Sequence, residues 1–187
     1  MELNEAIAQR RSIRNYLDKN VPKEVIERLI EAAIWAPSGS NAQPWAFSVI
    51  ENTDKLYQLS QEIKAYLLGN LDRIPNLQKY RETLSNPEYR VFYNAPCLLT
   101  IYAKYQSGPN AVGDCYIASQ NVMLAAHDMG LGSCFCGFAI QYLNEPDVKK
   151  RFGVAEENQA VAPIMLGYPA VAPPPPLRKK PEIIFWK

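Results

Sequence analysis

Apolar residues recur at helical spacing in five segments of the chain, and this period predicts an α-helix for each. The predicted helices cover residues 3–9, 22–35, 54–68, 114–129 and 145–152. Continuous apolar, β-branched and aromatic runs predict three buried strands, at residues 45–51, 97–103 and 161–167. Gly130 follows the fourth helix, where it is expected to form a left-handed C-terminal cap.

The order of these elements is helix, helix, strand, helix, strand, long helix, helix and strand. This order favours a single α+β domain over residues 1–187, with helices flanking a mostly antiparallel mixed sheet, and it disfavours a regular βαβ repeat. The run GLGSCFCGF at 130–138 reads as a glycine-bracketed loop or a short strand. Beyond the third helix, the segment up to residue 94 is polar, is broken by Pro75 and Pro87, and gives no clear element.

The composition changes abruptly after Gly167, where YPAVAPPPPLRKKPEIIFWK forms a proline-rich arm (residues 168–187). Consecutive prolines favour polyproline II, so residues 169–178 could span roughly 28 Å. The apolar tip at 183–186 reads as a short strand that needs a surface to dock on. It could return to its own core, but its reach suits a neighbouring subunit better, which predicts a homodimer with an exchanged arm.

Charge and hydropathy exclude several classes of protein. The 20 basic and 19 acidic side chains nearly cancel, which argues for neither nucleic-acid nor membrane binding. No run approaches the roughly 18 apolar residues of a membrane span. The first residues are polar where a signal peptide has a long apolar run, so we expect a cytoplasmic protein.

The four cysteines are expected to be reduced and mostly buried. Cys134 and Cys136 have one intervening residue, whereas zinc-binding pairs have two to four, and His127 is the one histidine. We therefore predict no metal site. The same spacing is poor geometry for a disulfide, which disfavours redox-dithiol chemistry for this pair.

Arg10, Arg11, Ser12, Ile13 and Arg14 form the first segment with chemical potential. Alternate residues of an extended segment share a face, so Arg10, Ser12 and Arg14 point one way. Two guanidinium groups around a hydroxyl suit a phosphate. Taken alone, the segment is better explained as a solvated basic patch.

Three further segments could contact a ligand. The run APSGSNAQPW at 36–45 gives a rigid loop whose backbone and amide groups suit a flat polar ring, although it could also be a plain turn. The glycines at 130–138 let backbone N–H groups approach a ligand, but they lack the GxGxxG spacing of a Rossmann fold. Arg178 and Lys180 share a face of the extended arm and, alone, would be a charged tail.

Together these segments resemble the nitroreductase family of FMN-dependent oxidoreductases. The resemblance rests on RRSIRNY, APSGSNAQPW, DCYIASQNVMLAAHDMGLGSCFCGF, and LGYP followed by the proline-rich, basic, aromatic-ended arm. The order and spacing of these motifs agree with those of the family over nearly the whole chain, except at residues 52–94. The resemblance implies an intertwined homodimer with two FMN molecules in clefts between the subunits.

The resemblance also implies roles for individual residues. Arg10 and Ser12 would bind the FMN phosphate with Arg11 alongside, and Arg14 would reach the ribityl chain and the pyrimidine edge. A segment of the other subunit would approach the flavin through Pro37, Ser38, Gly39 and Asn41. The loop against the flavin ring would be Cys134, Phe135, Cys136 and Gly137. The basic pair that completes the phosphate site would be Arg178 and Lys180.

The implied chemistry is electron transfer from NAD(P)H to a small acceptor such as a nitroaromatic or a quinone. Arg14 would stabilise negative charge near N1 and the C2 carbonyl, and an N–H of Cys136 or Gly137 would orient the ring near N5. The cofactor supplies the reaction, so no catalytic side chain is named. Five aromatic residues could stack on the acceptor or pack in the core, namely Tyr66, Tyr80, Tyr89, Phe92 and Tyr93. The alternatives are an FMN enzyme for one metabolite, in dehalogenation, flavin metabolism or dehydrogenation, and a flavin-binding sensor without turnover.

Overall fold

The structure of the protein, a computed structural model, describes residues 1–74 and 76–187. Its strands are β1 (Trp45–Ile50), β2 (Cys97–Lys104), β3 (Gly132–Phe135) and β4 (Asn158–Gly167). Its helices are α1 (Leu3–Gln9), α2 (Lys23–Ile34), α3 (Thr53–Gly69), α4 (Arg81–Ser85), α5 (Ala111–Asp128), α6 (Ala139–Leu143) and α7 (Pro146–Arg151). The five predicted helices and three predicted strands are therefore present; α1 has the predicted bounds, and each of the others is shifted at one end or both. The short helices α4 and α6 were not predicted, since five residues are too few to show a helical period.

The strands form one sheet in the order β1-β2-β4-β3. Each neighbouring pair of these strands is antiparallel, which confirms the predicted mostly antiparallel sheet; a parallel pairing occurs as the isolated bridge between Ser12 and Ser133. The chain reverses direction between every two neighbours, which leaves no parallel pair among the described strands. The α+β class is confirmed.

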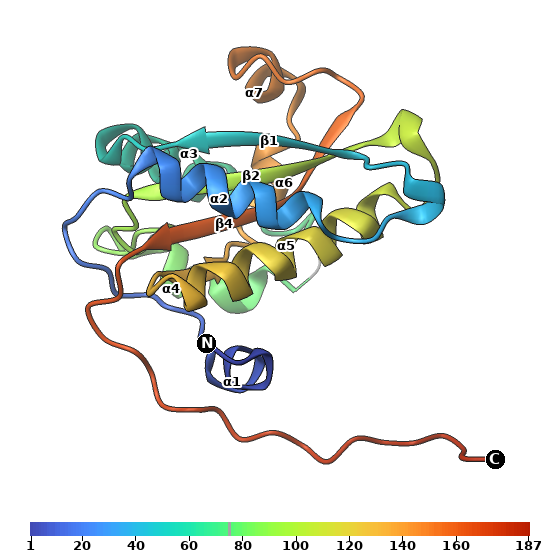
Figure 1. Ribbon diagram of the computed structural model, residues 1–187. Coiled ribbons are helices and arrows are strands. Elements are labelled where there is room, and N and C mark those ends of the chain that lie inside the picture. Colours follow the sequence, from blue (N-terminus) through green and yellow to red (C-terminus); the bar gives the residue numbers. More distant parts are fainter. Residues whose placement is uncertain (75) are drawn as a thin grey trace.

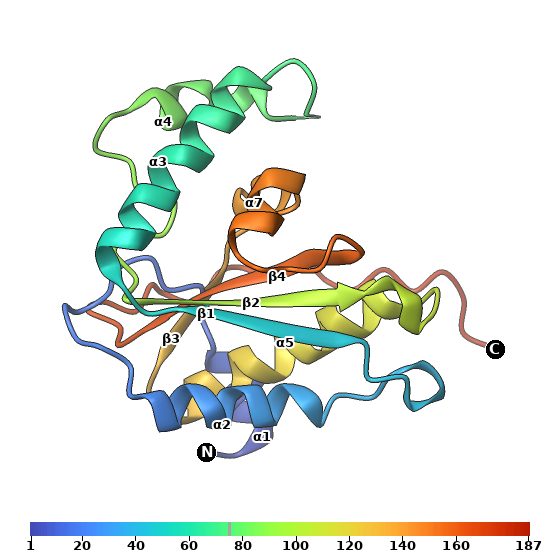
Figure 2. The ribbon, with the colours of Figure 1, turned by 90° about the horizontal axis from the view of Figure 1, so that it is seen from above.

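Helices cover both faces of the sheet (Figures 1 and 2). On β2, Cys97, Leu99 and Ile101 belong to the core beneath α2 and α5. Leu98 and Tyr102 belong to the core beneath α3 and α6. Burial on both faces explains why β2 reads as a continuous apolar run and does not alternate with polar residues.

Local capping sets the ends of the long helices. The N–H of Gly130, at φ 75°, donates to the His127 carbonyl, and the N–H of Leu131 donates to that of Ala126. This is a Schellman ending, which confirms the predicted cap of α5. At its other end α5 begins at Ala111, so the predicted start at Asp114 lies inside the first turn, where a carboxylate complements the helix dipole.

The N-terminal segment lies against the free edge of β3. Ser12 bridges Ser133 in a parallel arrangement, and the Ile13 N–H donates to the Ser133 carbonyl at 3.0 Å. A Cβ at Gly132 would lie 2.6 Å from Cγ1 of Ile13, so only glycine allows this approach. The run at 130–138 therefore contains a true strand, and the strand positions residues 10–14.

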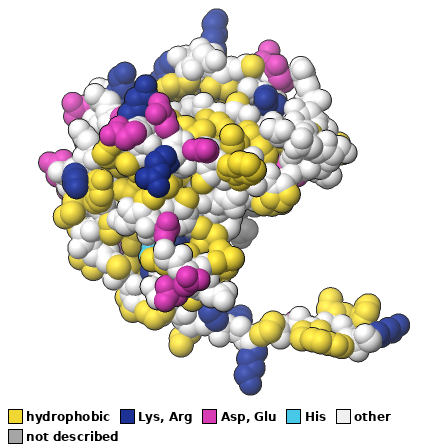
Figure 3. All heavy atoms as spheres, in the orientation of Figure 1, with side chains coloured by type: hydrophobic (Ala, Val, Ile, Leu, Met, Phe, Trp, Pro, Cys, Tyr) yellow, Lys and Arg dark blue, Asp and Glu magenta, His cyan; other side chains and the backbone are white. Residues whose placement is uncertain are grey.

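The C-terminal arm extends away from the rest of the chain (Figure 1). Beyond Ala170 it is exposed and forms no strand, so the predicted tail strand is absent from the single chain, which offers it no partner strand. Apolar side chains gather at its far end, clear of the body (Figure 3). Among the described residues, none of the helices is both long and apolar enough for a membrane crossing.

Candidate functional site

A cavity of about 300 Å³ opens where β3 ends and α6 begins. Five of the residues predicted to bind a ligand line it, one from the N-terminal segment and four from the exit of β3. The complete lining is Arg14, Tyr80, Tyr89, Val91, Tyr93, Cys134, Phe135, Cys136, Gly137, Phe138 and Met165. We call this the β3 cavity.

Arg14 and Cys134 both line the β3 cavity, and Ser12 pairs with Ser133, the residue before Cys134. Burial raises the pKa of the Cys134 thiol, while the positive charges of Arg14 and Arg10 act to lower it. The thiol donates to the Phe135 carbonyl at 3.6 Å. The guanidinium carbon of Arg14 lies 6.0 Å from the centre of the Tyr93 ring. Of the three residues predicted to share a face, Arg14 lines the β3 cavity, whereas Arg10 and Ser12 do not.

Arg11 lies on the other side of the segment. Its guanidinium donates to the carbonyls of Ala8 at 2.7 Å and Arg10 at 2.9 Å. These contacts fold the side chain back onto the end of α1. The structure therefore does not bring Arg11 to the β3 cavity.

Cys136 is held in place on both its backbone and its side chain. Its N–H donates to the Pro163 carbonyl at 2.8 Å, and its thiol donates to the Val91 carbonyl at 3.7 Å. The N–H is thus engaged within the chain, which leaves that of Gly137 as the candidate to face a ligand. Burial raises the pKa of the Cys136 thiol to about 12, so the group stays protonated at neutral pH and is a poor redox nucleophile.

The loop that carries Pro37, Ser38, Gly39 and Asn41 is not part of the lining of the β3 cavity, as far as the described residues of a single chain form it. Its conformation is nevertheless unusual, since Ser40, Asn41 and Gln43 all have φ between 48° and 56°. Non-glycine residues keep such φ values only where their surroundings enforce them, often at ligand sites. The Gly39 N–H donates to the carboxylate of buried Asp114 at 3.1 Å. Sequence reasoning missed this anchor, although an acidic residue at a helix start was a usable signal.

Arg178 and Lys180 lie on the exposed arm, and the single chain does not bring them to the β3 cavity. The arm would have to meet a second molecule, or fold back, for them to complete a phosphate site.

The aromatic residues divide between two environments. Tyr80, Tyr89 and Tyr93 line the β3 cavity, whereas the Tyr66 hydroxyl donates to Glu145 at 2.7 Å and Phe92 is buried. Tyr89 and Tyr93 meet edge to face, with ring centres 5.8 Å apart. Phe138 was not proposed as an aromatic contact, although it ends the glycine-rich run; it meets Tyr80 edge to face at 5.0 Å.

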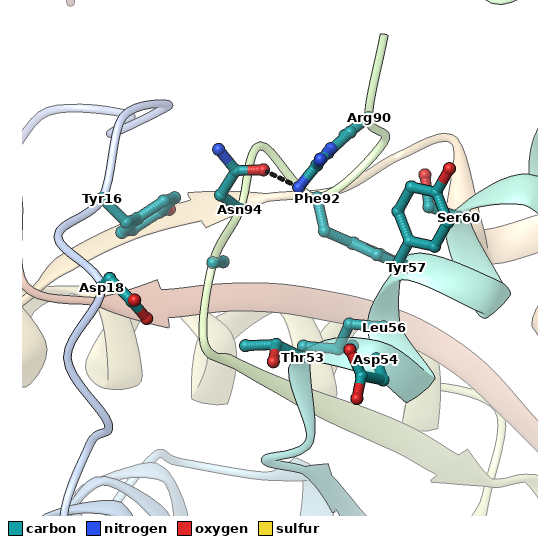
Figure 4. A pocket seen from close by; sticks show the side chains of 11 residues that line it. Tyr16, Asp18, Thr53, Asp54, Leu56, Tyr57, Ser60, Arg90, Phe92 and Asn94 are labelled. Atoms are coloured by element: carbon teal, nitrogen blue, oxygen red, sulfur yellow. Dashed lines mark hydrogen bonds between the residues drawn. The ribbon is translucent and has the colours of Figure 1, made fainter. Parts of the chain in front are cut away.

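A second cavity of about 510 Å³ lies behind the same aromatic segment (Figure 4). Arg90, Phe92 and Asn94 line this cavity, while their sequence neighbours Tyr89, Val91 and Tyr93 line the β3 cavity. The carboxylates of Asp18 and Asp54 face it together with a single guanidinium, which donates to Asn94 at 2.6 Å. This charge balance disfavours a phosphate dianion, so the smaller β3 cavity is the better candidate site.

Comparison with known proteins fits this arrangement. The model of the nitroreductase family matches residues 7–168, which include the N-terminal basic segment, the 37–41 loop and the exit of β3. The chain belongs to the nitroreductase family.

Individual members of the nitroreductase family cover most of this chain. A protein of Methanothermobacter thermautotrophicus with the provisional name NADH dehydrogenase/NAD(P)H nitroreductase is 31% identical over 92% of this chain and 80% of its own length. A solved nitroreductase with bound FMN from Bacteroides fragilis is 29% identical, with a TM-score of 0.79 over 98% of this chain and 96% of that one. A second, from Desulfitobacterium hafniense and also with bound FMN, has the same identity and TM-score, over 98% and 97% of the two chains.

Proposed function

We propose that this nitroreductase binds FMN at the β3 cavity and transfers electrons from NAD(P)H to a small acceptor such as a nitroaromatic or a quinone. The observation that carries the proposal is that Arg14 and the exit of β3 line a cavity walled by aromatic rings, next to the basic segment that pairs with Ser133. The Arg10 guanidinium and the Ser12 hydroxyl of that segment suit a phosphate dianion, and an aromatic wall suits a flat ring. The FMN held by two solved relatives supports the same assignment.

Each residue of this set has a physical task. Arg10 and Ser12 would hold the phosphate, and Arg14 would face the pyrimidine edge, where its fixed charge stabilises the negative charge that reduction places there. The Gly137 N–H would orient the ring. When bound, FMN supplies the redox chemistry by taking a hydride from NAD(P)H and passing electrons to the acceptor. Burial of Cys134 and Cys136 keeps their thiols out of this chemistry.

A second copy of the chain would complete the site. Ile184, Phe185 and Trp186 at the tip of the arm are 90%, 73% and 86% exposed, which is unfavourable for such large apolar side chains. Tyr116 and Ile117 on α5 are also exposed, as are Leu3 and Ile7 on α1. A dimer with exchanged arms would cover these residues. It would also give Arg178 and Lys180 a phosphate to bind, and the 37–41 loop a flavin to approach. The four cysteines are buried and form no disulfide, which fits a reducing compartment. We therefore propose that the protein is cytoplasmic.

Anaerobic steady-state kinetics test the proposed function. If NAD(P)H and the acceptor occupy one cleft in turn, turnover is ping-pong. Double-reciprocal plots of the initial rate against NAD(P)H concentration, at several 1,4-benzoquinone concentrations, should then give parallel lines. Intersecting lines would contradict the single cleft. A yellow protein that oxidises neither NADH nor NADPH would instead be a sensor. A screen of halogenated phenols, free flavins and nitroaromatics then separates the general reductase from an enzyme for one metabolite.

A further inference from the structure

Lys64 lies on α3 and is only 6% exposed, which is unusual for a lysine. Its ammonium group donates to the carbonyls of Asn86 at 2.7 Å and Tyr89 at 3.0 Å. A buried ammonium is costly unless its donors are used, and here they are used on the backbone of one segment, residues 86–94. The side chain therefore fastens that segment to α3.

Ser60, one turn earlier on α3, makes the next contact. Its hydroxyl accepts a hydrogen bond from the Val91 N–H at 2.9 Å, and Ser60 is also buried. The Val91 carbonyl in turn accepts from the Cys136 thiol. The backbone of residues 86–91 is thus attached to α3 on one side and to the exit of β3 on the other.

The fastened segment carries part of the aromatic wall. Tyr89, Val91 and Tyr93 line the β3 cavity, while Figure 4 shows Ser60 and Tyr57 of α3 by the opposite face of the same segment. Tyr93 and Asn94 have φ of 50° and 61°. Backbone of this kind persists only where neighbouring contacts enforce it, which agrees with a segment that is held.

We propose that Lys64 and Ser60 are positioning residues that hold residues 86–94, and so fix Tyr89 and Tyr93 as a preformed wall for a flat, electron-poor aromatic acceptor. The inference rests on the proposed function and adds to it the residues that determine acceptor binding. A preformed wall lowers the cost of binding, because no loop must be ordered when the acceptor enters. The electron-rich faces of the two phenol rings favour an electron-poor ring over an aliphatic acceptor.

Limited trypsin digestion of the FMN-loaded protein tests the attachment without using activity. Arg90 is exposed, and the bond that trypsin would cut after it includes the N–H held by Ser60. Lys64→Met and Ser60→Ala should each be cut after Arg90 at least about tenfold faster than wild type, the factor expected from one lost charge-assisted hydrogen bond or one strong neutral bond. Lys55→Met, an exposed lysine of the same helix, is the control and should be cut at the wild-type rate.

The acceptor role needs a second measurement on the same variants. The KM for 4-nitrobenzoate should rise severalfold in Lys64→Met and Ser60→Ala and should stay at the wild-type value in Lys55→Met. Unchanged cleavage, or faster cleavage with an unchanged KM, would overturn the inference. Should Lys64→Met fail to fold, Ser60→Ala decides alone. A wild-type protein that takes up no FMN would refute the proposed function, and the acceptor role would fall with it even if trypsin confirmed the attachment.

Discussion

The contact between Gly132 and Ile13 provides a test of the site that changes none of its charges. A Cβ added at Gly132 would lie 2.6, 2.8 and 2.9 Å from Cγ1, Cβ and Cγ2 of Ile13. Rotating the isoleucine cannot relieve this overlap, because its own Cβ takes part in it. In Gly132→Ala the backbone of residues 12–14 must therefore move away from β3. The side chains of Ser12 and Arg14 move with it.

The expected size follows from overpacking, which costs about 1–3 kcal/mol for an added methyl group in a packed interior. For a chain of this length the melting temperature should fall by about 2–4 °C for each kcal/mol. If the whole cost of the displacement falls on the free energy of FMN binding, FMN affinity should drop by about fivefold to about 150-fold.

Calorimetry of the apoprotein and quenching of FMN fluorescence on titration measure the two effects. Gly69→Ala is the matched control, because a Cβ at the last residue of α3 meets no atom within 4 Å; it should leave FMN affinity unchanged and should not lower the melting temperature. Wild-type FMN affinity in Gly132→Ala would refute the idea that the approach of residues 10–14 to β3 builds the phosphate site.

Three further predictions concern single features. Arg10→Ala should weaken FMN binding by about tenfold or more, the loss of one charge-assisted contact, whereas Arg11→Ala, whose guanidinium caps α1, should bind FMN normally in the same titration. A chain ended after Ala172 keeps the bonds from Leu17 to Tyr168 and from Ala170 to Asn15, yet it should be monomeric and colourless by light scattering and absorbance; a yellow dimer would remove the exchanged arm from the account. Burial raises the pKa of Cys97, Cys115 and Cys136 to about 12 and also raises that of Cys134, so a disulfide reagent at pH 8 should titrate almost no thiol until urea unfolds the protein, and rapid native labelling would contradict this.

The fold was largely predictable because its long elements bury whole faces. The stripes of α2 and α5 and the apolar run of β2 each reflect packing against the sheet, and such patterns are visible in sequence. The antiparallel pairing of every neighbour depends on how the chain returns to the sheet, which no local pattern encodes. The short helices α4 and α6 could not be predicted, because five residues are too few to show the helical period of apolar positions.

The site was predictable where its chemistry is local. Alternation predicted that Arg10, Ser12 and Arg14 share a face; in the structure Ser12 pairs with Ser133 and Arg14 lines the β3 cavity, and their binding roles stay predictions. The engagement of the Cys136 N–H by Pro163 could not be foreseen, because it depends on the register of β3 with β4. The burial of Lys64 could not be foreseen either. Its partners, the carbonyls of Asn86 and Tyr89, lie more than twenty residues away along the chain, and no local pattern around Lys64 indicates them.

Competition among three flavins for the apoprotein tests the central claim most directly. Equimolar FMN, FAD and riboflavin are added to the apoprotein, and the bound pigment is separated, released by heat and identified by chromatography. FMN should be recovered almost alone, favoured over riboflavin by at least about tenfold, because riboflavin lacks the phosphate that Arg10 and Ser12 are proposed to hold. Recovery of FAD, or equal binding of FMN and riboflavin, would show that no FMN phosphate site exists there.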